Sequence, residues 1–167
     1  MSSKSMAISH FLANSFNEII KTEELAIANR FPNLTFREMA LIEAVHVACL
    51  RKTDNSSTAI ANKLKVTAGT LTISANQLEK KGYLIRKRWD KDKRVVRLFT
   101  TEAGKEAYEF HRLFHLELVN GMVETLTDEE VEALIRALSG ISTFFRSKDK
   151  KLRIIDKVKE YVDTIDY

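Results

Sequence analysis

Turn-forming residues and cysteine are scarce in this chain. Its 167 residues include one proline, five glycines and one cysteine. Because tight turns depend on proline and glycine, this scarcity favours a few long helices over a sheet of many short strands. The single cysteine, Cys49, excludes an internal disulfide framework, so we expect a reducing compartment, the cytoplasm.

The sequence lacks the motifs that are typical of several functional classes. No apolar run is long enough to span a membrane, and the N-terminal stretch lacks the pattern of a secretory signal peptide, so we expect no membrane partner. A Gly-rich phosphate loop, a Ser–His–Asp set and a pair of catalytic acids are also missing. We therefore expect neither an enzyme nor a cofactor. The 44% hydrophobic and 30% charged content suits one folded domain of ordinary size.

Positive charge is concentrated in one short stretch. The chain carries a formal net charge of +4. Between Lys80 and Arg97, nine basic residues stand against two acidic ones, a net charge of +7, which leaves −3 for the remainder. A charged stretch is often only a solvated surface, but this one follows a helix of small polar residues. That combination indicates a polyanionic partner.

Helical periodicity and capping signals divide the chain into helices around one hairpin. Apolar residues recur at helical spacing over 6–29, and Pro32 ends that helix. Residues 148–167 are predicted to form a C-terminal helical extension. Three threonines are predicted N-caps of other helices, two of them in capping boxes: Thr35 with Glu38, Thr127 with Glu130, and Thr101.

The middle of the chain has the order of a winged helix-turn-helix. "TAIANKLKV" is typical of a short amphipathic helix, and Thr67 is predicted to cap a second helix. "GYLIRKRWD" and "RVVRLFT" alternate like strands, with "KDK" as the turn between them. The sequence therefore predicts a mainly α-helical fold with a small β-hairpin wing.

The helix after Thr67 has an unusual outer face. Leu71, Ala75 and Leu78 fall on one side at 100° per residue and are predicted to be buried. The other side carries small polar residues where solvent alone would favour Glu, Lys and Ala. We predict that it enters a major groove about 12 Å wide, with amide contacts to adenine and methyl contacts to thymine. Its predicted DNA-binding residues are Thr67, Gly69, Thr70, Thr72, Ile73, Asn76, Gln77 and Lys80.

The hairpin tip supplies a second predicted DNA contact. Its basic residues are expected to enter the adjacent minor groove, and its acidic residue is expected to pair with Arg94 and fix the tip. These wing residues are Lys91, Asp92, Lys93 and Arg94. Other basic residues can contact phosphates, which positions a protein without reading sequence: Lys80, Lys81, Arg86, Lys87 and Arg88.

The stretch "IANKLKVTAGTLTISANQLEKKGYLIRKRWDKDKRVVRLFTTEAG" resembles the MarR family of bacterial winged-helix regulators. Thr100 stands where the family usually has leucine, a small departure at the end of a strand. The resemblance covers roughly residues 10–147 and implies a homodimer on a palindromic operator in double-stranded DNA. The matching family positions are Leu78, Glu79, Gly82, Asp92, Arg94, Thr101 and Gly104.

Within this family, "NRFPNLTFREM", "VTAGTLTISANQLEKKGY" and "HRLFH" are most similar to repressors of fatty-acid synthesis genes. This similarity implies that acyl groups on acyl-carrier protein, or another small hydrophobic effector, strengthen repression. Apolar residues outside the central domain also predict dimerisation. We expect residues 1–34 and 102–147 to form a helical dimerisation region, and residues 35–101 to form the DNA-binding domain.

Other readings stay open, and the first concerns a metal. His111 and His115 lie four residues apart on one predicted helix face, as metal ligands can. Some MarR-family members sense zinc with ligands from the first two helices, where Glu23, Glu24 and His46 are candidates. Ala40 stands where such a sensor would have a histidine, so we predict no metal. We assign His111, His115 and Arg30 to an effector pocket.

The remaining alternatives are a sensor of phenolic compounds and a winged-helix module that binds proteins instead of DNA. A peroxide sensor is a further possibility for Cys49. Single-cysteine sensors of this family keep that residue near the first helix, whereas Cys49 falls late in the second predicted helix. We therefore interpret it as a small buried apolar residue.

Overall fold

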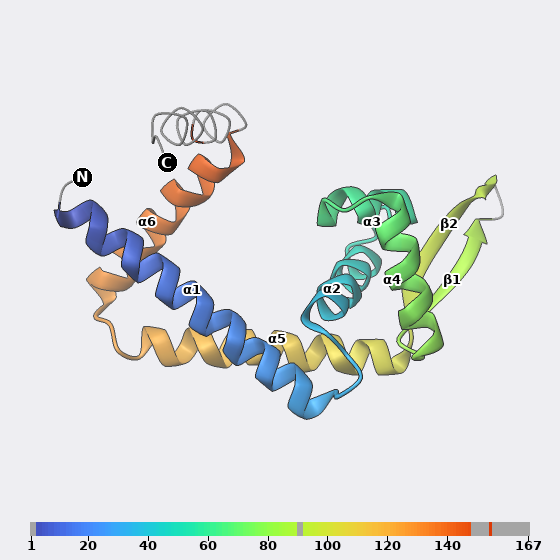
Figure 1. Ribbon diagram of the computed structural model, residues 1–167, viewed down its shortest axis with the longest axis horizontal. Helices are drawn as coiled ribbons and strands as arrows, with labels where there is room; N and C mark the ends of the chain where they lie inside the picture. The colour runs from blue at the N-terminus through green and yellow to red at the C-terminus, as the bar shows by residue number, and fades with distance from the viewer. Residues whose placement is uncertain (1–2, 90–91, 148–153, 155–167) are drawn as a thin grey trace, which may run out of the picture. The chain divides into compact units, whose positions relative to one another are not determined.

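Helices dominate the protein, as predicted (Figure 1). The computed structural model describes residues 3–89, 92–147 and 154. None of the described helices is both long and apolar enough to cross a membrane. Most of the predicted C-terminal extension lies outside the described residues. The elements in chain order are α1 Ser3–Arg30, α2 Phe36–Leu50, α3 Ser57–Leu64, α4 Ala68–Lys80, β1 Leu84–Trp89, β2 Asp92–Thr100, α5 Glu102–Val123 and α6 Asp128–Arg146.

The chain divides into two compact units, residues 1–117 and residues 118–167. The first contains the helix-turn-helix, the hairpin, α1 and most of α5. The second contains the end of α5 and α6, whose predicted capping box is present at Thr127 and Glu130. This division crosses α5, so it differs from the functional division expected from the sequence, which stays a prediction.

Helix α2 begins where the sequence signals place it. Helix α1 ends at Arg30, two residues before Pro32, because proline cannot continue a helix interior. The Thr35 hydroxyl accepts a hydrogen bond from the Glu38 backbone N–H at 3.2 Å, and the Thr35 N–H donates to the Glu38 carboxylate at 3.0 Å. Both halves of the capping box are therefore formed.

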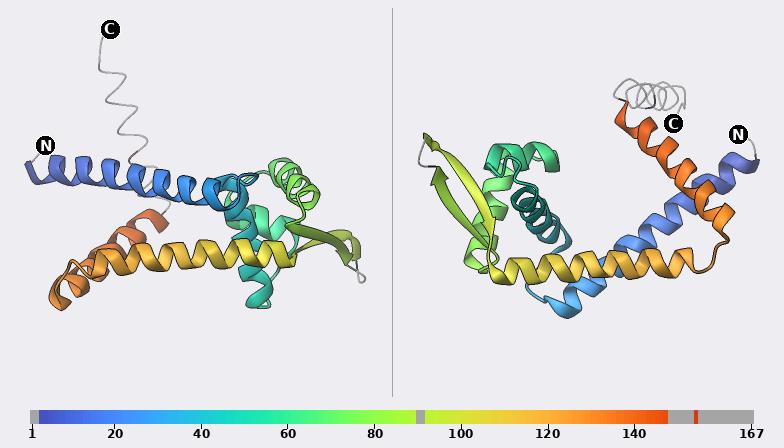
Figure 2. Two further views of the ribbon diagram at one scale, coloured as in Figure 1. Left: turned by 90° about the horizontal axis from the view of Figure 1, so that it is seen from below. Right: turned by 180° about the vertical axis from the view of Figure 1, so that it is seen from behind.

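Helices α3 and α4 with strands β1 and β2 form the predicted winged helix-turn-helix. Lys65, with φ 56°, makes the left-handed turn that ends α3, and the Thr67 side chain caps α4. The strands pair antiparallel, with Ile85 opposite Phe99 and an irregularity after Arg88. Strand β2 begins two residues earlier than predicted. In every view the hairpin extends away from α2, α3 and α4 (Figure 2).

The core of the first unit holds α4 by its apolar side. Leu71, Ala75 and Leu78 are all buried, as predicted from their spacing. Helix α4 packs against α2, α3 and β1. Tertiary packing, and not strong helix propensity, therefore stabilises α4 and leaves its outer face exposed. The fully buried side chains around it include Met39, Ile42, Val45, Ile60, Leu84 and Leu98.

The start of α5 lies close to Tyr83, the residue that precedes β1. The Thr101 N–H donates to the Tyr83 carbonyl at 3.1 Å, and the Thr101 hydroxyl accepts from the Gly104 N–H at 3.1 Å. A Cβ atom at Gly104 would lie 2.3 Å from that same carbonyl oxygen. Only glycine fits here without movement of the backbone, which explains the glycine of the motif at residues 101–104.

Candidate nucleic-acid interface

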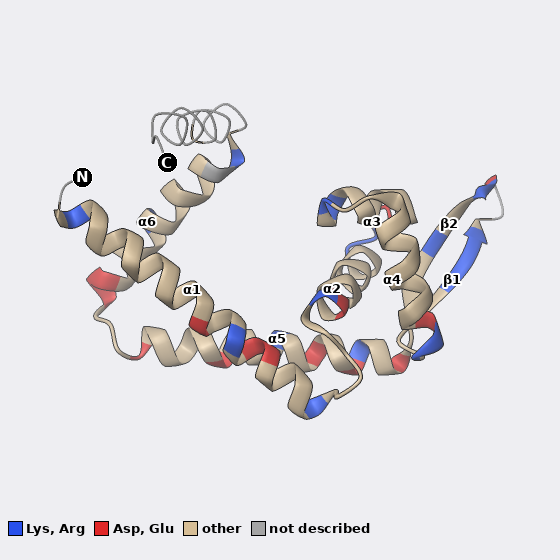
Figure 3. Cartoon of the chain, in the orientation of Figure 1, with Lys and Arg blue, Asp and Glu red and all other residues tan. Residues whose placement is uncertain are grey.

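The outer face of α4 is exposed and nearly free of charge. Figure 3 shows α4 without acidic or basic residues until its C-terminal end, while both strands of the hairpin are rich in Lys and Arg. Ile73, a large apolar residue on this face, is 61% exposed. The predicted residues Thr67, Gly69, Thr70, Thr72, Gln77 and Lys80 are also exposed.

The threonine hydroxyl groups at the start of α4 make hydrogen bonds within the helix. The Thr72 hydroxyl donates to the Ala68 carbonyl at 2.8 Å. The Thr67 and Thr70 hydroxyl oxygens lie 2.9 Å apart, and Thr67 also accepts from the Thr70 N–H at 3.1 Å. These side chains can therefore offer methyl groups and oxygen lone pairs to an external partner, and the Thr67–Thr70 pair also has one hydroxyl proton left to donate.

Gly69 has no structural reason to be glycine within this chain. The nearest atom that an added Cβ would meet is the Thr67 hydroxyl oxygen, at an ordinary contact distance of 3.9 Å. Its φ lies outside the left-handed region that favours glycine. Glycine weakens a helix by about 1 kcal/mol relative to alanine. Glycine at this position is therefore not required by the packing of the chain itself.

Asn76 lies less far outward than its spacing predicts. Its side chain is half-buried, and its Oδ1 atom is buried without a hydrogen-bond partner among the described residues. The cause is that α4 packs on three other elements, so its flanks are covered as well as its base. A bound partner that donates a hydrogen bond would satisfy this oxygen, provided that the side chain turns outward.

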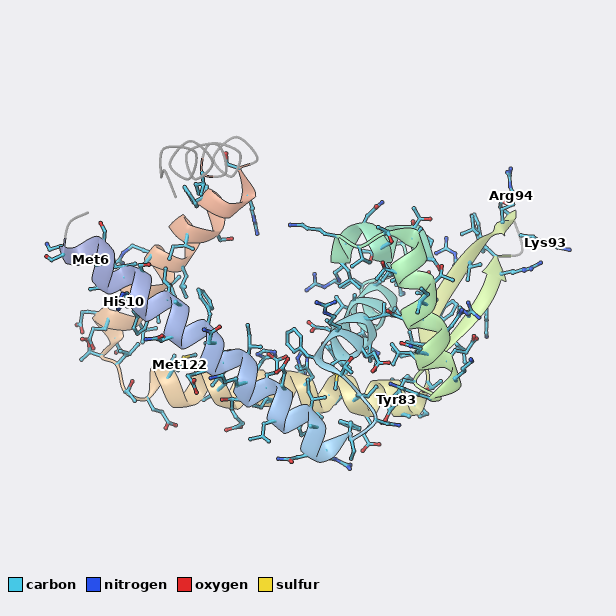
Figure 4. The ribbon with its side chains drawn as sticks, viewed as in Figure 1. Met6, His10, Tyr83, Lys93, Arg94 and Met122 are labelled. Atoms are coloured by element: carbon cyan, nitrogen blue, oxygen red, sulfur yellow. The ribbon has the colours of Figure 1, made fainter. Side chains whose placement is uncertain are left out.

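The hairpin tip holds its charges as predicted. Arg94 Nε lies 3.2 Å from Asp92 Oδ1, and the Arg94 N–H donates to the same oxygen at 3.0 Å. These hydrogen bonds lower the pKa of the Asp92 carboxyl. The Arg94 side chain is 91% exposed, and Lys93 and Arg94 both point away from the hairpin (Figure 4). Lys91 lies outside the described residues.

Two residues that we expected to contact phosphates form ion pairs with carboxylates of the same chain, although both residues are exposed. Lys81 Nζ lies 2.7 Å from a Glu38 carboxylate oxygen, and Arg86 lies 2.7 Å from the Glu79 carboxylate. The sequence pattern did not predict these pairs, because each joins two different elements. Glu38 lies on α2, and the Glu79–Arg86 pair joins α4 to β1. Lys80, Lys87 and Arg88 remain exposed and available.

Sequence reasoning also missed a basic hollow of about 460 Å³ between α3, α4 and the hairpin. Arg97 is its main organising residue, with its guanidinium 4.7 Å from the Trp89 ring centroid and 2.7 Å from the Asn55 amide oxygen. The Asn55 amide group also donates to the Leu98 carbonyl at 2.8 Å. These contacts hold the base of the hairpin to the loop before α3. The hollow is lined by Ser57, Thr58, Thr72, Arg86, Arg94 and Arg97, among others.

The predicted effector residues separate into two places. His111 and His115 meet, with their Nε2 atoms 3.1 Å apart, and both face Glu23 of α1. The ligand atoms of these three residues all lie within 4.8 Å of one another. Arg30 is not part of this cluster, because it pairs with Glu106 and lies over the Phe31 ring. An effector pocket shared by all three predicted residues stays a prediction.

The other candidate ligands lie apart from this cluster. His46 hydrogen-bonds Thr100 at 2.9 Å and contacts the Tyr108 ring, and Glu24 is exposed. Burial lowers the pKa of the His46 imidazole. Cys49 is partly buried against the core, with its thiol 3.7 Å from the Leu98 carbonyl, so it is less enclosed than predicted.

His111 is held between two carboxylates. It contacts Glu23 through Nε2, and its Nδ1 lies 3.2 Å from a Glu43 oxygen. Burial opposes the imidazolium, but the contacts with Glu43 and Glu23 outweigh it and raise the His111 pKa. The contact with His111 in turn lowers the Glu43 pKa despite its burial. Helices α1, α2 and α5 therefore meet at one buried imidazole.

This geometry predicts a pH-dependent stability. A raised folded-state pKa contributes stability that is present below the unfolded value of about 6.5 and is lost as pH rises through the folded value. We expect the difference in unfolding free energy between the wild type and His111→Gln to shrink between about pH 6.5 and the raised pKa. Urea unfolding at a series of pH values in EDTA measures it. A difference that stays constant across that window would contradict the charged state.

Comparison with known proteins gives a consistent picture. The sequence profile of the MarR family matches residues 42–96. The crystal structure of Streptococcus pneumoniae FabT in complex with DNA superposes with a TM-score of 0.80 and 30% identity, covering 85% of this chain and 97% of that one. The Staphylococcus aureus MepR–DNA complex, at 17% identity over 82% of this chain and 95% of that chain, shares the fold with a TM-score of 0.66.

A curated relative agrees with these structures. The Bacillus subtilis (strain 168) protein YwhA, described as an uncharacterized HTH-type transcriptional regulator, is 28% identical over 83 residues. The match covers 50% of this chain and 60% of that protein's length.

Proposed function

The chain belongs to the MarR family of DNA-binding transcriptional regulators, which are not enzymes, and on this premise we propose that it represses transcription as a homodimer on a palindromic operator. Helix α4 would read bases in the major groove, and Lys93, Arg94 and Lys91 of the hairpin would contact the adjacent minor groove. The observation that carries this proposal is the exposed, uncharged outer face of α4 beside a basic hairpin.

Exposed apolar side chains support the homodimer. In α1 the side chains of Met6, Ile8, Phe11, Phe16 and Ile20 are 43–69% exposed. In α6, Leu134, Ile135, Leu138 and Ile141 are also exposed. Exposed apolar side chains that recur along a helix are typical of an interaction face, and each of these two helices carries such a set. We therefore keep residues 1–34 and 102–147 as the proposed dimerisation region and residues 35–101 as the proposed DNA-binding domain.

Selection of binding sites from a random duplex library tests this proposal. We expect an inverted repeat whose half-sites lie about one helical turn apart, bound by two chains. Affinity should fall steeply with salt because phosphate contacts release counterions. A flat salt response with no enriched repeat would instead favour the protein-interaction module.

Gly69→Ala is expected to change stability and operator binding in opposite directions. Alanine removes the flexibility of glycine and meets no atom closer than 3.9 Å, so we expect unfolding to become harder by up to about 1 kcal/mol. Operator binding should weaken roughly tenfold, because the added methyl group occupies the space that DNA approaches. Chemical unfolding and fluorescence anisotropy on the selected operator measure both effects.

Gly140→Ala in α6 is the matched control for this variant. An added Cβ there meets nothing within 4 Å, and the position lies outside the proposed DNA contact. Because the position lies in the proposed dimerisation region, size-exclusion chromatography first checks that the variant is still a dimer. A dimeric Gly140→Ala should have a more stable helix and bind the operator like the wild type. If Gly69→Ala binds the operator like the wild type, Gly69 does not lie at the interface.

The finer proposal is control of fatty-acid synthesis genes with an acyl-carrier-protein-linked corepressor. It is supported by the segments that resemble this branch of the family and by the similarity to FabT over 97% of that chain. Anisotropy titrations with acylated and unacylated carrier protein test it. Operator affinity should rise only with the acylated form, and an equal response to both forms would exclude the acyl group as corepressor.

A metal sensor is the second candidate, and the cluster of Glu23, His111 and His115 favours it. Two imidazoles and one carboxylate fit a zinc site with an open fourth position, and Glu43 would orient His111 through its other nitrogen. Elemental analysis of the dialysed protein tests this candidate. One zinc per chain that is lost in His115→Ala would support a sensor, and a metal-free wild type after zinc loading would exclude it.

A further inference from the structure

Lys81 lies in the basic stretch that follows the recognition helix, yet its ammonium group is bound within the protein. Its Nζ lies 2.7 Å and 2.8 Å from the two carboxylate oxygens of Glu38. The Glu38 side chain is 7% exposed and that of Lys81 is 31% exposed. Two of its three N–H donors are therefore used by a largely buried carboxylate, which holds the ammonium group toward α2.

The same Glu38 carboxylate also forms the capping box of α2. One of its oxygens accepts hydrogen bonds from the Thr35 N–H at 3.0 Å and from the Thr35 hydroxyl at 3.1 Å. Burial alone would raise the Glu38 pKa, but Lys81 and Thr35 outweigh it and lower the pKa. Glu38 is therefore a charged group that joins the start of α2 to the C-cap residue of α4.

A second contact joins the same two regions. The Tyr83 hydroxyl, just beyond α4, donates to the Asn33 amide oxygen at 2.9 Å. The Tyr83 ring also meets Phe31 edge-on, with centroids 6.4 Å apart. Phe31 and Asn33 belong to the loop that connects α1 with α2. Tyr83 lies beside the beginning of β1 (Figure 4), so both contacts hold the C-terminal end of α4.

We propose that Glu38 and Lys81 are positioning residues that fix the C-terminal end of the recognition helix for base reading, and that Lys81 is not a phosphate ligand. This inference rests on the proposed DNA-binding role of α4. A helix of 13 residues is about 20 Å long, so a small rotation at its C-terminal end displaces side chains near its start. Base contacts depend on such geometry more than phosphate contacts do.

The neighbouring Lys80 provides a matched comparison, because it is exposed on the same turn. Each variant is titrated with the selected operator and with a random duplex at several salt concentrations. Lys80→Met should flatten the slope of log affinity against log salt by about one unit, as loss of one phosphate contact does. Lys81→Met should leave that slope unchanged and lower the ratio of operator to random affinity about tenfold.

Glu38→Gln tests the same contact from its other side. Glutamine can complete a capping box, so α2 keeps its start while Lys81 loses its charged partner. We expect the same loss of specificity as in Lys81→Met, and no further loss in the double variant. The conservative variant Lys81→Arg should keep wild-type specificity, because arginine can also pair with Glu38. Thermal unfolding by circular dichroism checks that each variant is folded.

Three results would overturn the positioning role. The first is a slope reduced by one unit in Lys81→Met. The second is wild-type specificity in Glu38→Gln beside a loss of specificity in Lys81→Met, since Lys81 would then act without Glu38. The third is wild-type specificity in both variants. A wild-type protein that binds no duplex would overturn the proposed function as well, which distinguishes the two failures.

Discussion

Ile73→Asp is expected to abolish operator binding while the protein stays folded. The Ile73 side chain is 61% exposed near the middle of α4, so its replacement costs the core little. In the proposed complex it faces the major groove, where a carboxylate would meet the negative potential of DNA. Like charges brought together at an interface cost several kcal/mol, so affinity should fall by roughly a hundredfold or more. Anisotropy titration on the selected operator measures it.

Leu50→Asp is the control for that variant. Leu50 is 62% exposed at the end of α2, so it has the same exposure and receives the same charge. It should bind the operator within a few-fold of the wild type, since Leu50 lies outside the proposed DNA contact and the variant changes the complex only through net charge. Equal losses in the two variants would show that a negative charge anywhere weakens binding, and the proposed surface would be wrong.

Gly104→Ala is expected to have the largest effect on stability. The new Cβ would lie 2.3 Å from the Tyr83 carbonyl oxygen and 3.2 Å from Thr100 Cβ. Because a backbone atom cannot move aside as a side chain can, α5 must shift away from the start of β1. Overpacking of this kind costs about 1–3 kcal/mol. A loss near 2 kcal/mol lowers Tm by roughly 4–8 °C in a chain of this size.

Gly121→Ala on the same helix shows whether the effect depends on position. No atom lies within 4 Å of a Cβ added there, so alanine should stabilise the helix by up to about 1 kcal/mol. Differential scanning calorimetry of both variants measures the contrast. If Gly104→Ala melts with or above the wild type, the close approach of α5 to Tyr83 does not constrain the protein.

The sequence predicts the local features of this fold well because they depend on neighbouring residues. Thr35, Thr67 and Thr127 cap their helices through backbone groups three residues away, a distance fixed by the helix itself. The buried side of α4 follows equally from helical spacing. The Asp92–Arg94 pair spans two residues of one strand, so it too could be predicted.

The features that could not be predicted join residues far apart in the chain. Nothing in the stretch around Lys81 indicates that Glu38, on another helix, neutralises it. His111 and His115 were recognisable as a pair, but Glu23 was one of several candidates until α1 and α5 were seen together. The exact start of β2 depended on the hairpin register, which neither strand specifies alone.

The weak helix propensity of α4 has an evolutionary consequence. Its apolar side is held by α2, α3 and β1, so the outward residues contribute little to folding. Substitutions at those positions therefore change what the helix recognises without threatening the native state. A duplicated copy of such a gene can acquire a different operator through a few accepted mutations, and paralogues should diverge first on this face.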